Sequence, residues 1–146
     1  MVQVKALCEA TIASVRHRVT PGVTLSLDPD VPNADFFTDP IRLQQILNNL
    51  LTNAAKFTAT GSIVLSYATG RDGKEMTFTV TDTGIGINPE NKEKIFDRFV
   101  KLDRDSQGAG LGLTISRLLA RHLGGDLWLD TSYKAGARFC LSLPGR

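Results

Sequence analysis

The stretch PIRLQQILNNLLTNAAKFT, residues 40–58, combines an apolar face with an unusual polar flank. Its apolar residues recur with the period of an α-helix, which predicts an amphipathic helix packed on a core. Asp39 and Pro40 are typical of the first residues of a helix, and we expect this one to run to about Phe57. The predicted apolar stripe consists of Leu43, Ile46, Leu47, Leu50, Leu51 and Ala54.

The polar flank of this helix is formed by Asn49, Asn53 and Lys56. At about 100° per residue, these three positions fall within about 60° of one another. Asparagine is a mediocre helix former, so two asparagines above a lysine call for an explanation. Amide oxygens suit Mg²⁺ as ligands, and a lysine ammonium suits a phosphate. The flank is therefore a candidate metal and phosphate site, and a solvated polar surface is the alternative.

Helices and hairpin strands alternate on both sides of this helix. Upstream, the pattern predicts a helix over about 4–19, ended by Pro21-Gly22, and strands over 23–27 and 36–37. Downstream, it predicts a turn at 71–73, helices over about 89–99 and 111–122, and strands over 62–68, 76–82, 126–132 and 137–144. Because the strands come mostly as neighbouring hairpins, the expected class is α+β. We expect a two-layer α/β sandwich whose mixed, mostly antiparallel sheet is covered on one face by three helices.

Size, charge and cysteine content limit the class of protein. The 146 residues are typical of one domain, so we expect a single domain over 1–146. The formal net charge of +2 gives no case for nucleic-acid binding. No apolar run is long enough to span a membrane, and the first ten residues lack the features of a signal peptide. Cys8 and Cys140 lie far apart without metal-ligand spacing, which favours two reduced thiols and a cytoplasmic location.

A pair of glycines follows the predicted strand over 76–82, in the stretch DTGIGI, residues 82–87. Gly84 and Gly86 can adopt positive φ and leave room for a flat ligand against the backbone. Asp82, at the end of the strand, can accept a hydrogen bond from an exocyclic amine. This stretch therefore predicts a binding site for a base, and an ordinary Asp-x-Gly turn is the alternative.

A second glycine-rich stretch, GAGLGL at residues 108–113, leads into the predicted helix over 111–122. Gly108, Gly110 and Gly112 would expose backbone N–H groups at a helix N-terminus, where an anion is favoured. A flexible entry loop is the alternative. A dinucleotide-binding loop does not fit, because Gly112 follows Gly110 by only two residues. Together with the polar helix flank, the two stretches favour a nucleotide site over three unrelated features.

Four motifs occur in a fixed order along the chain: NNLLTNAAKFT (48–58), DTGIGI (82–87), IFDRF (95–99) and GAGLGL (108–113). They resemble the asparagine box, first glycine box, phenylalanine box and second glycine box of one domain family. That family is the catalytic, ATP-binding domain of two-component sensor histidine kinases, within the superfamily shared with type II topoisomerases and ATP-driven chaperones. The ending GARFCLSLP (136–144) resembles the last strand of the family, so the resemblance covers nearly the whole chain.

The resemblance implies a role for each residue that matches a motif. Asn53 would bind Mg²⁺ with Asn49 beside it, and Asp82 would read the adenine amino group. The implied catalytic residues are Asn49, Lys56 and Lys101, with Lys101 as a lid cation on the γ-phosphate. The implied nucleotide site comprises Asn49, Asn53, Lys56, Phe57, Asp82, Gly84, Gly86, Ile87, Lys101, Gly108, Gly110, Leu111, Gly112 and Leu113. Phe96 and Phe99 would support the hinge of the lid or contact a partner helix.

Two positions depart from the pattern of the family. Ala109 stands where a small hydroxyl residue is common, and the region around Ala137 lacks the threonine often found near the adenine. Both changes remove a possible hydroxyl contact, so adenine affinity is expected to be lower. Neither removes a residue needed to hold Mg²⁺ or phosphate.

The resemblance implies that the chain binds ATP and Mg²⁺ and presents the γ-phosphate to a histidine on a separate dimerisation and phosphoacceptor domain. A response regulator would act downstream, and the chain would be a monomeric fragment of a larger sensor. His17 is followed by Arg18 rather than an acidic residue, so it does not resemble the acceptor. His122 suits the C-terminal end of its predicted helix, where a cation is favourable.

Two alternatives belong to other classes. A self-contained ATPase of the same superfamily would use ATP to drive a conformational clamp, and such relatives carry a glutamate four residues before the Mg²⁺ asparagine. Asn49 stands at that position here and cannot take a proton from water. A degenerate scaffold that only binds partners is the other alternative, and intact Asp82, Asn53 and Lys56 argue against it.

Overall fold

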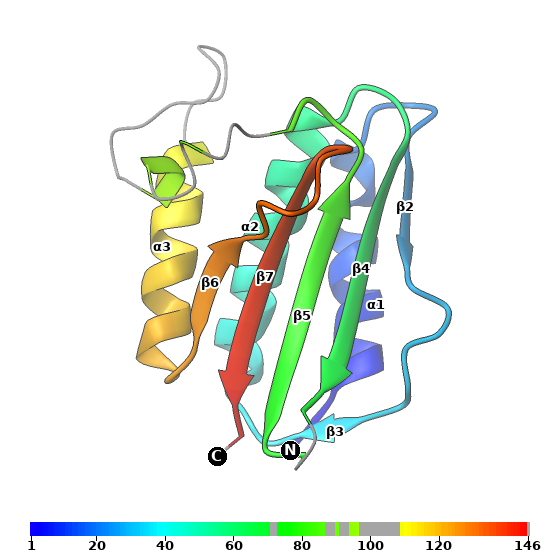
Figure 1. The fold of residues 1–146 in the computed structure, drawn as a ribbon. Coiled ribbons are helices and arrows are strands. Elements are labelled where there is room, and N and C mark those ends of the chain that lie inside the picture. The colour runs from blue at the N-terminus through cyan, green and yellow to red at the C-terminus, as the bar shows by residue number, and fades with distance from the viewer. Residues whose placement is uncertain (71–72, 87–89, 91–93, 97–108, 146) are drawn as a thin grey trace.

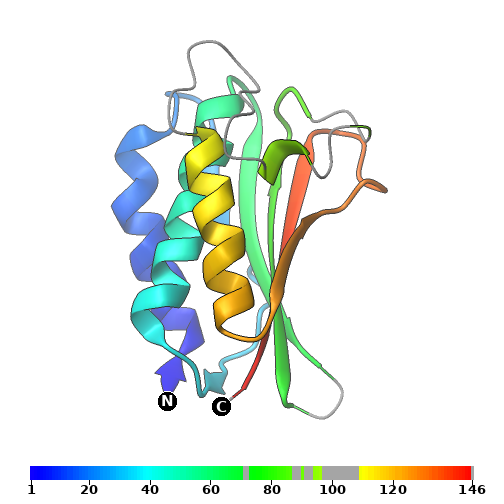
Figure 2. The ribbon, with the colours of Figure 1, turned by 90° about the vertical axis from the view of Figure 1, so that its left-hand side faces the viewer.

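The computed structural model describes residues 1–70, 73–86, 90, 94–96 and 109–145. Three helices form one layer: α1 (Val4–Val15), α2 (Pro40–Phe57) and α3 (Ala109–His122). All three cover the same face of a five-stranded sheet, as the edge-on view in Figure 2 shows. The predicted two-layer α/β sandwich is therefore confirmed.

The sheet has the strand order β2-β4-β5-β7-β6 (Figure 1). Its members are β2 (Thr24–Leu27), β4 (Ser62–Thr69), β5 (Glu75–Asp82), β7 (Ala137–Pro144) and β6 (Asp126–Leu129). Only β2 and β4 pair in parallel, and the other three pairs are antiparallel, which confirms a mixed, mostly antiparallel sheet. A separate two-stranded ribbon joins β1 (Val2–Gln3) to β3 (Asp35–Phe36).

The core lies between the two layers. Helix α2 buries the whole stripe that the sequence predicts, and each of its six residues is at most 2% exposed. Strand β5 alternates buried and half-buried residues, with Met76, Phe78 and Val80 facing the helices. Fully burying one such side chain contributes about 1.5–3 kcal/mol, so the match between helix stripe and strand alternation holds the layers together.

The start of α2 has the predicted cap. Asp39 Oδ1 accepts hydrogen bonds from the backbone N–H groups of Ile41 (3.0 Å) and Arg42 (3.2 Å), and Pro40 occupies the first turn. These bonds pair two of the N–H groups that a helix start leaves unsatisfied. The cap fixes where the helix begins and therefore the rotation of its polar flank.

Several element boundaries differ from the sequence prediction. Helix α1 ends at Val15 and continues only as the 3₁₀ turn η1 (Arg16–Arg18), four residues short of the predicted end at about 19. Helix α3 begins at Ala109, two residues before the predicted start. Strand β6 ends at Leu129 rather than 132, because the Asp130 carboxylate accepts from the N–H and hydroxyl of Ser132 and turns the chain. Of the predicted helix over 89–99, the structure describes residue 90 and the 3₁₀ turn η3 (Lys94–Phe96).

Both cysteines are buried and free of disulfide bonds. Burial raises the pKa of Cys8 to about 12, and it also raises the pKa of Cys140. Thiols in such surroundings are poor nucleophiles, which agrees with the expectation of two reduced structural cysteines. Within the part of the chain that the structure describes, no helix is long and apolar enough to cross a membrane.

Candidate nucleotide-binding site

One end of the molecule gathers the predicted motifs. In Figure 1 the C-terminal ends of α2 and β5 and the N-terminal ends of β7 and α3 all lie at the upper end, away from both termini. The backbone N–H of Ile85 donates to the carbonyl of Phe57 at 3.3 Å, which joins the turn after β5 to the end of α2. The asparagine motif and the first glycine motif therefore meet there.

Asp82 is a buried polar residue at this end. It is 4% exposed, and its Oδ1 accepts from the backbone N–H groups of Gly84 (2.9 Å) and Ala137 (3.2 Å). Burial raises the pKa of the Asp82 carboxyl above its usual value, and these two N–H donors only partly counteract that rise. A carboxylate with one oxygen held by the backbone presents its other oxygen in a fixed direction, which suits recognition of an amine.

Glycines permit the close backbone contacts around Asp82. A Cβ on Gly84 would lie 2.2 Å from the carbonyl oxygen of Phe57, and one on Gly136 would lie 2.0 Å from that of Asp82. Gly86 has a φ of +74°, a conformation that residues with side chains rarely adopt. The positive φ that the sequence predicted is thus found at Gly86 but not at Gly84, whose glycine is needed for close packing on Phe57, and space for a flat ligand beside them stays a prediction. Gly136 was missed, because its partner lies far away in the sequence and is known only from the pairing of β5 with β7.

Asn53 has an unusual environment for a polar side chain. It is 7% exposed, and among the described residues no hydrogen-bond partner reaches its buried Oδ1. Leaving such a group unpaired costs about 1–3 kcal/mol, so a folded protein tolerates it mainly where something else binds there. An amide oxygen is a hard ligand of the kind Mg²⁺ takes, so this atom fits the predicted metal site. Thr58 Oγ1, just after α2, is buried and unpartnered in the same way and was not predicted.

Asn49 lies one turn before Asn53 on α2 and is half-buried. Its Nδ2 donates to Ser116 Oγ on α3 at 3.1 Å, and Ser116 is fully buried. The contact joins two helices across 67 residues of sequence, so Asn49 has a structural partner as well as its predicted role. Lys56, two turns from Asn49, is exposed, and Phe57 is half-buried.

Phe96 of the phenylalanine motif is fixed by α3 and β7. Thr114 Oγ1 donates to its carbonyl at 2.7 Å, the Arg117 guanidinium lies 4.4 Å from the centre of its ring, and the ring meets Phe139 edge-on at 6.2 Å. It is 7% exposed. Its predicted role at a lid hinge stays a prediction, and Phe99 lies outside the described residues.

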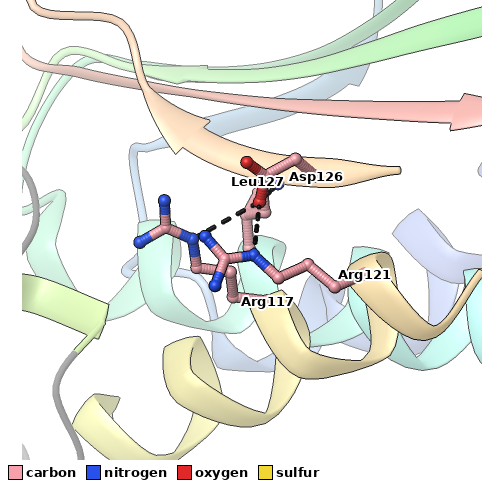
Figure 3. Close-up of polar contacts among 4 residues, drawn as sticks. All are labelled: Arg117, Arg121, Asp126 and Leu127. Carbon is pink, nitrogen blue, oxygen red and sulfur yellow. Dashed lines mark hydrogen bonds and ion pairs between the residues drawn. The ribbon is translucent and has the colours of Figure 1, made fainter. Parts of the chain in front are cut away.

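Arg117 also contacts Asp126, the first residue of β6 (Figure 3). Asp126 Oδ1 lies 3.4 Å from Arg117 Nε and 3.1 Å from Arg121 Nε, and accepts from the backbone N–H of Leu127 at 2.8 Å. Although partial burial raises the pKa of Asp126, the Leu127 and arginine donors outweigh it and hold that pKa below its usual value. The ion pairs fix α3 against the sheet edge.

The second glycine motif is described only from Ala109 onward. Gly110, Leu111, Gly112 and Leu113 lie in the first turns of α3. Leu113 is 1% exposed, and in a regular helix its N–H pairs with the carbonyl of Ala109, which favours Gly110 and Leu111 over Leu113 as anion donors. Ile87, Gly108 and the predicted lid cation Lys101 lie outside the described residues.

Comparison with known proteins agrees with this architecture. Residues 38–146 match the family model described as histidine kinase-, DNA gyrase B-, and HSP90-like ATPase. The chain belongs to this ATPase family, as the ordered motifs predicted.

Its relatives narrow the class further. The sensor protein TorS of Escherichia coli (strain K12) is 38% identical over 145 residues, which cover 97% of this chain and 16% of TorS. The crystal structure of full-length ShkA in complex with AMPPNP matches with a TM-score of 0.87 and 32% identity, over 99% of this chain and 30% of ShkA. The mycobacterial sensor histidine kinase MprB matches with a TM-score of 0.82 and 26% identity, over 99% of this chain and 96% of that structure. Within the family, the chain is homologous to the ATP-binding catalytic domain of sensor histidine kinases.

Proposed function

We propose that this chain binds Mg²⁺-ATP and presents the γ-phosphate to a histidine on a separate dimerisation and phosphoacceptor domain of the same kinase, upstream of a response regulator. The observation that carries the proposal is the buried Oδ1 of Asn53, which no hydrogen-bond partner reaches among the described residues. It lies on the helix whose end meets the glycine turn after Asp82. A base-recognising carboxylate and a candidate metal ligand thus belong to one end of the fold.

The adenine end of the site rests on Asp82. Its Oδ1 is occupied by two backbone donors, so its second oxygen is the one that would accept from the adenine 6-amino group. Gly84 and Gly86 let the turn after β5 pack closely against the backbone of Phe57 and Gly136, which would hold Asp82 and the backbone beside the base in place. A guanine, with a carbonyl at the corresponding position, would face this carboxylate with an acceptor.

The phosphate end rests on α2 and on the start of α3. Asn53 Oδ1 and the neighbouring Asn49 amide would hold Mg²⁺, with Lys56 nearby as a phosphate contact. When bound, Mg²⁺ would neutralise charge on the β- and γ-phosphates. The N–H groups at the start of α3 would face the phosphates, where the helix dipole favours an anion. Lys101 would add a cation from the segment between η3 and α3.

Rapid hydrolysis is not expected from this arrangement. Helix α2 contains no Asp or Glu, and Asn49 at the position of a water-activating carboxylate is tied to Ser116. Without a general base, attack by water loses about 10²–10⁴-fold in rate. The nucleophile is therefore expected to come from another domain, and the self-contained ATPase stays the less favoured alternative.

The variant Asp82→Asn separates the contribution of the Asp82 charge to ATP binding from its contribution to folding stability. The introduced amide would keep one oxygen for Gly84 and Ala137, but would place an N–H₂ donor where the second carboxylate oxygen faced the amine. ATP affinity is expected to fall by about 10-fold or more, because two donors would then meet. The folded apo domain is expected to become more stable at neutral pH, since burial disfavours the wild-type charge. Isothermal titration with ATP and urea unfolding measure the two effects.

The pH dependence of the free energy of unfolding tests the sign of the stability change in Asp82→Asn. The pKa of Asp82 in the folded state lies above the ordinary value of 3.8. The destabilisation caused by its buried charge is therefore absent below that pH, and it grows as the pH rises until the folded carboxyl is fully ionised. The stability gain of Asp82→Asn should therefore be larger at pH 7.5 than near pH 4. Asp28→Asn is the matched control, because Asp28 also accepts a backbone N–H, from Asp30 at 2.9 Å, but follows the edge strand β2. Unchanged ATP affinity in Asp82→Asn would contradict the adenine assignment.

A further inference from the structure

Tyr133 lies on the connection between β6 and β7, and its hydroxyl donates to the backbone carbonyl of Asp82 at 3.2 Å. The two residues are 51 positions apart in sequence. Tyr133 is half-buried, and nothing in the motifs of the sequence singles it out. Its hydroxyl contacts the main chain of the residue that would recognise the base.

The ring of Tyr133 is held in place by Arg138, a residue of β7. The Arg138 guanidinium lies 4.4 Å from the ring centre, its Nε donates to Thr81 Oγ1 at 3.1 Å, and its Nη1 lies 3.7 Å from Asp130 Oδ2. The N–H of Tyr133 also approaches the Asp130 carbonyl at 3.4 Å. Because Arg138 contacts both the ring and the residue before Asp82, it links the connection to the end of β5.

Three contacts from residues 133–137 converge on Asp82. The Tyr133 hydroxyl and the backbone of Gly136 meet its carbonyl oxygen, and the Ala137 N–H holds its Oδ1. The carbonyl contact fixes the peptide plane after Asp82, and the N–H contact fixes the carboxylate. A site residue needs this kind of support, because a tilt of about 10–20° spoils a directional hydrogen bond.

We propose that Tyr133 is a positioning residue that orients Asp82 toward the 6-amino group of adenine and so contributes to base discrimination. This inference rests on the proposed function, since it assumes that Asp82 accepts from that amine. Without the hydroxyl, the Asp82 carbonyl loses the side-chain donor that Tyr133 supplies, and the peptide plane can tilt. The carboxylate then points less accurately at the amine, while the phosphate contacts on α2 and α3 are unaffected.

The test compares ATP with purine riboside 5′-triphosphate, which lacks only the 6-amino group, in titrations of the 146-residue chain with Mg²⁺. Wild type is expected to prefer ATP. Tyr133→Phe removes one oxygen atom, and is expected to weaken ATP binding by about 3–10-fold while leaving affinity for the purine analogue within about twofold. The ratio of the affinity for ATP to the affinity for the purine analogue should therefore decrease. A merely structural role would weaken both ligands alike and leave the ratio unchanged.

Tyr67→Phe is the matched control, because Tyr67 is the only other tyrosine and also donates to a backbone carbonyl, that of Pro32. It should leave the ratio at the wild-type value. Arg138→Gln, which keeps the Tyr133 hydroxyl but removes the guanidinium, should lower this affinity ratio less than Tyr133→Phe does. An unchanged ratio in Tyr133→Phe and Arg138→Gln overturns the inference while the proposed function stands. A wild-type chain that does not distinguish the two nucleotides overturns the proposed adenine contact, and this inference with it.

Discussion

Replacing Asn53 by alanine is expected to lower phosphoryl transfer to the acceptor histidine by about 10²–10³-fold without destabilising the fold. The activity loss follows from removing an oxygen that would hold Mg²⁺ against the phosphates. The stability result follows from the structure, because the buried Oδ1 has no partner to lose among the described residues. Alanine removes that unpaired group and is the best helix former, which offsets the small cavity it leaves.

Asn48→Ala is the control for this variant. Asn48 precedes Asn53 on α2, is half-buried, and donates to Ser14 Oγ at 3.2 Å. Its replacement should cost about 0.5–1.5 kcal/mol of stability and leave phosphoryl transfer unchanged, the reverse of the Asn53 result. Urea unfolding and transfer from γ-labelled ATP measure the two effects. Full activity in Asn53→Ala, or a stability loss above about 2 kcal/mol, would contradict the metal-ligand assignment.

Gly136→Ala is expected to destabilise the domain by about 3 kcal/mol or more, although it adds a single methyl group. The new Cβ would lie 2.0 Å from the Asp82 carbonyl oxygen and 2.8 Å from its carbon. Gly136 is not among the described glycines with positive φ, so the cost comes from space alone. The clashing atoms are backbone of β5 and cannot rotate away, so relief requires the β6–β7 connection to leave Asp82.

Gly112→Ala provides the contrast. Gly112 lies within α3, and among the described residues a Cβ there would meet nothing within 4 Å. Because alanine is favoured over glycine in a helix by about 0.8–1.0 kcal/mol, this variant should be as stable as wild type or more stable. Thermal and urea unfolding of both variants, followed by nucleotide titration, give the comparison. Equal stability of Gly136→Ala and wild type would show that the β6–β7 connection does not approach Asp82 this closely at Gly136.

The parts of the fold that depend on local pattern were predictable. The apolar stripe of α2, the Asp39 cap and the bounds of β7 follow from periodicity and capping chemistry, and the structure confirms them. The predicted boundaries of elements were wrong where a local side-chain contact ends the element. Asp130 is an example, because its hydrogen bonds with Ser132 end β6 early. Periodicity carries no information about such turns.

The supporting contacts of the site were less predictable than its motifs. Gly136 and Tyr133 matter because the pairing of β5 with β7 brings them to Asp82, and a register cannot be read from composition. The Asn49–Ser116 contact likewise depends on how α2 packs beside α3. The sequence predicts which residues would carry the chemistry, whereas the three-dimensional structure identifies the residues that contact them.

Transfer of label from γ-labelled ATP tests the central claim most directly. The chain is incubated with Mg²⁺ and labelled ATP, with and without the purified acceptor domain of its own full-length protein. We predict acid-labile, base-stable label on the acceptor domain only when this chain is present, no label on this chain, and slow phosphate release in the absence of the acceptor. Label on this chain alone would contradict the account. So would rapid phosphate release without a partner, which would instead support a self-contained ATPase.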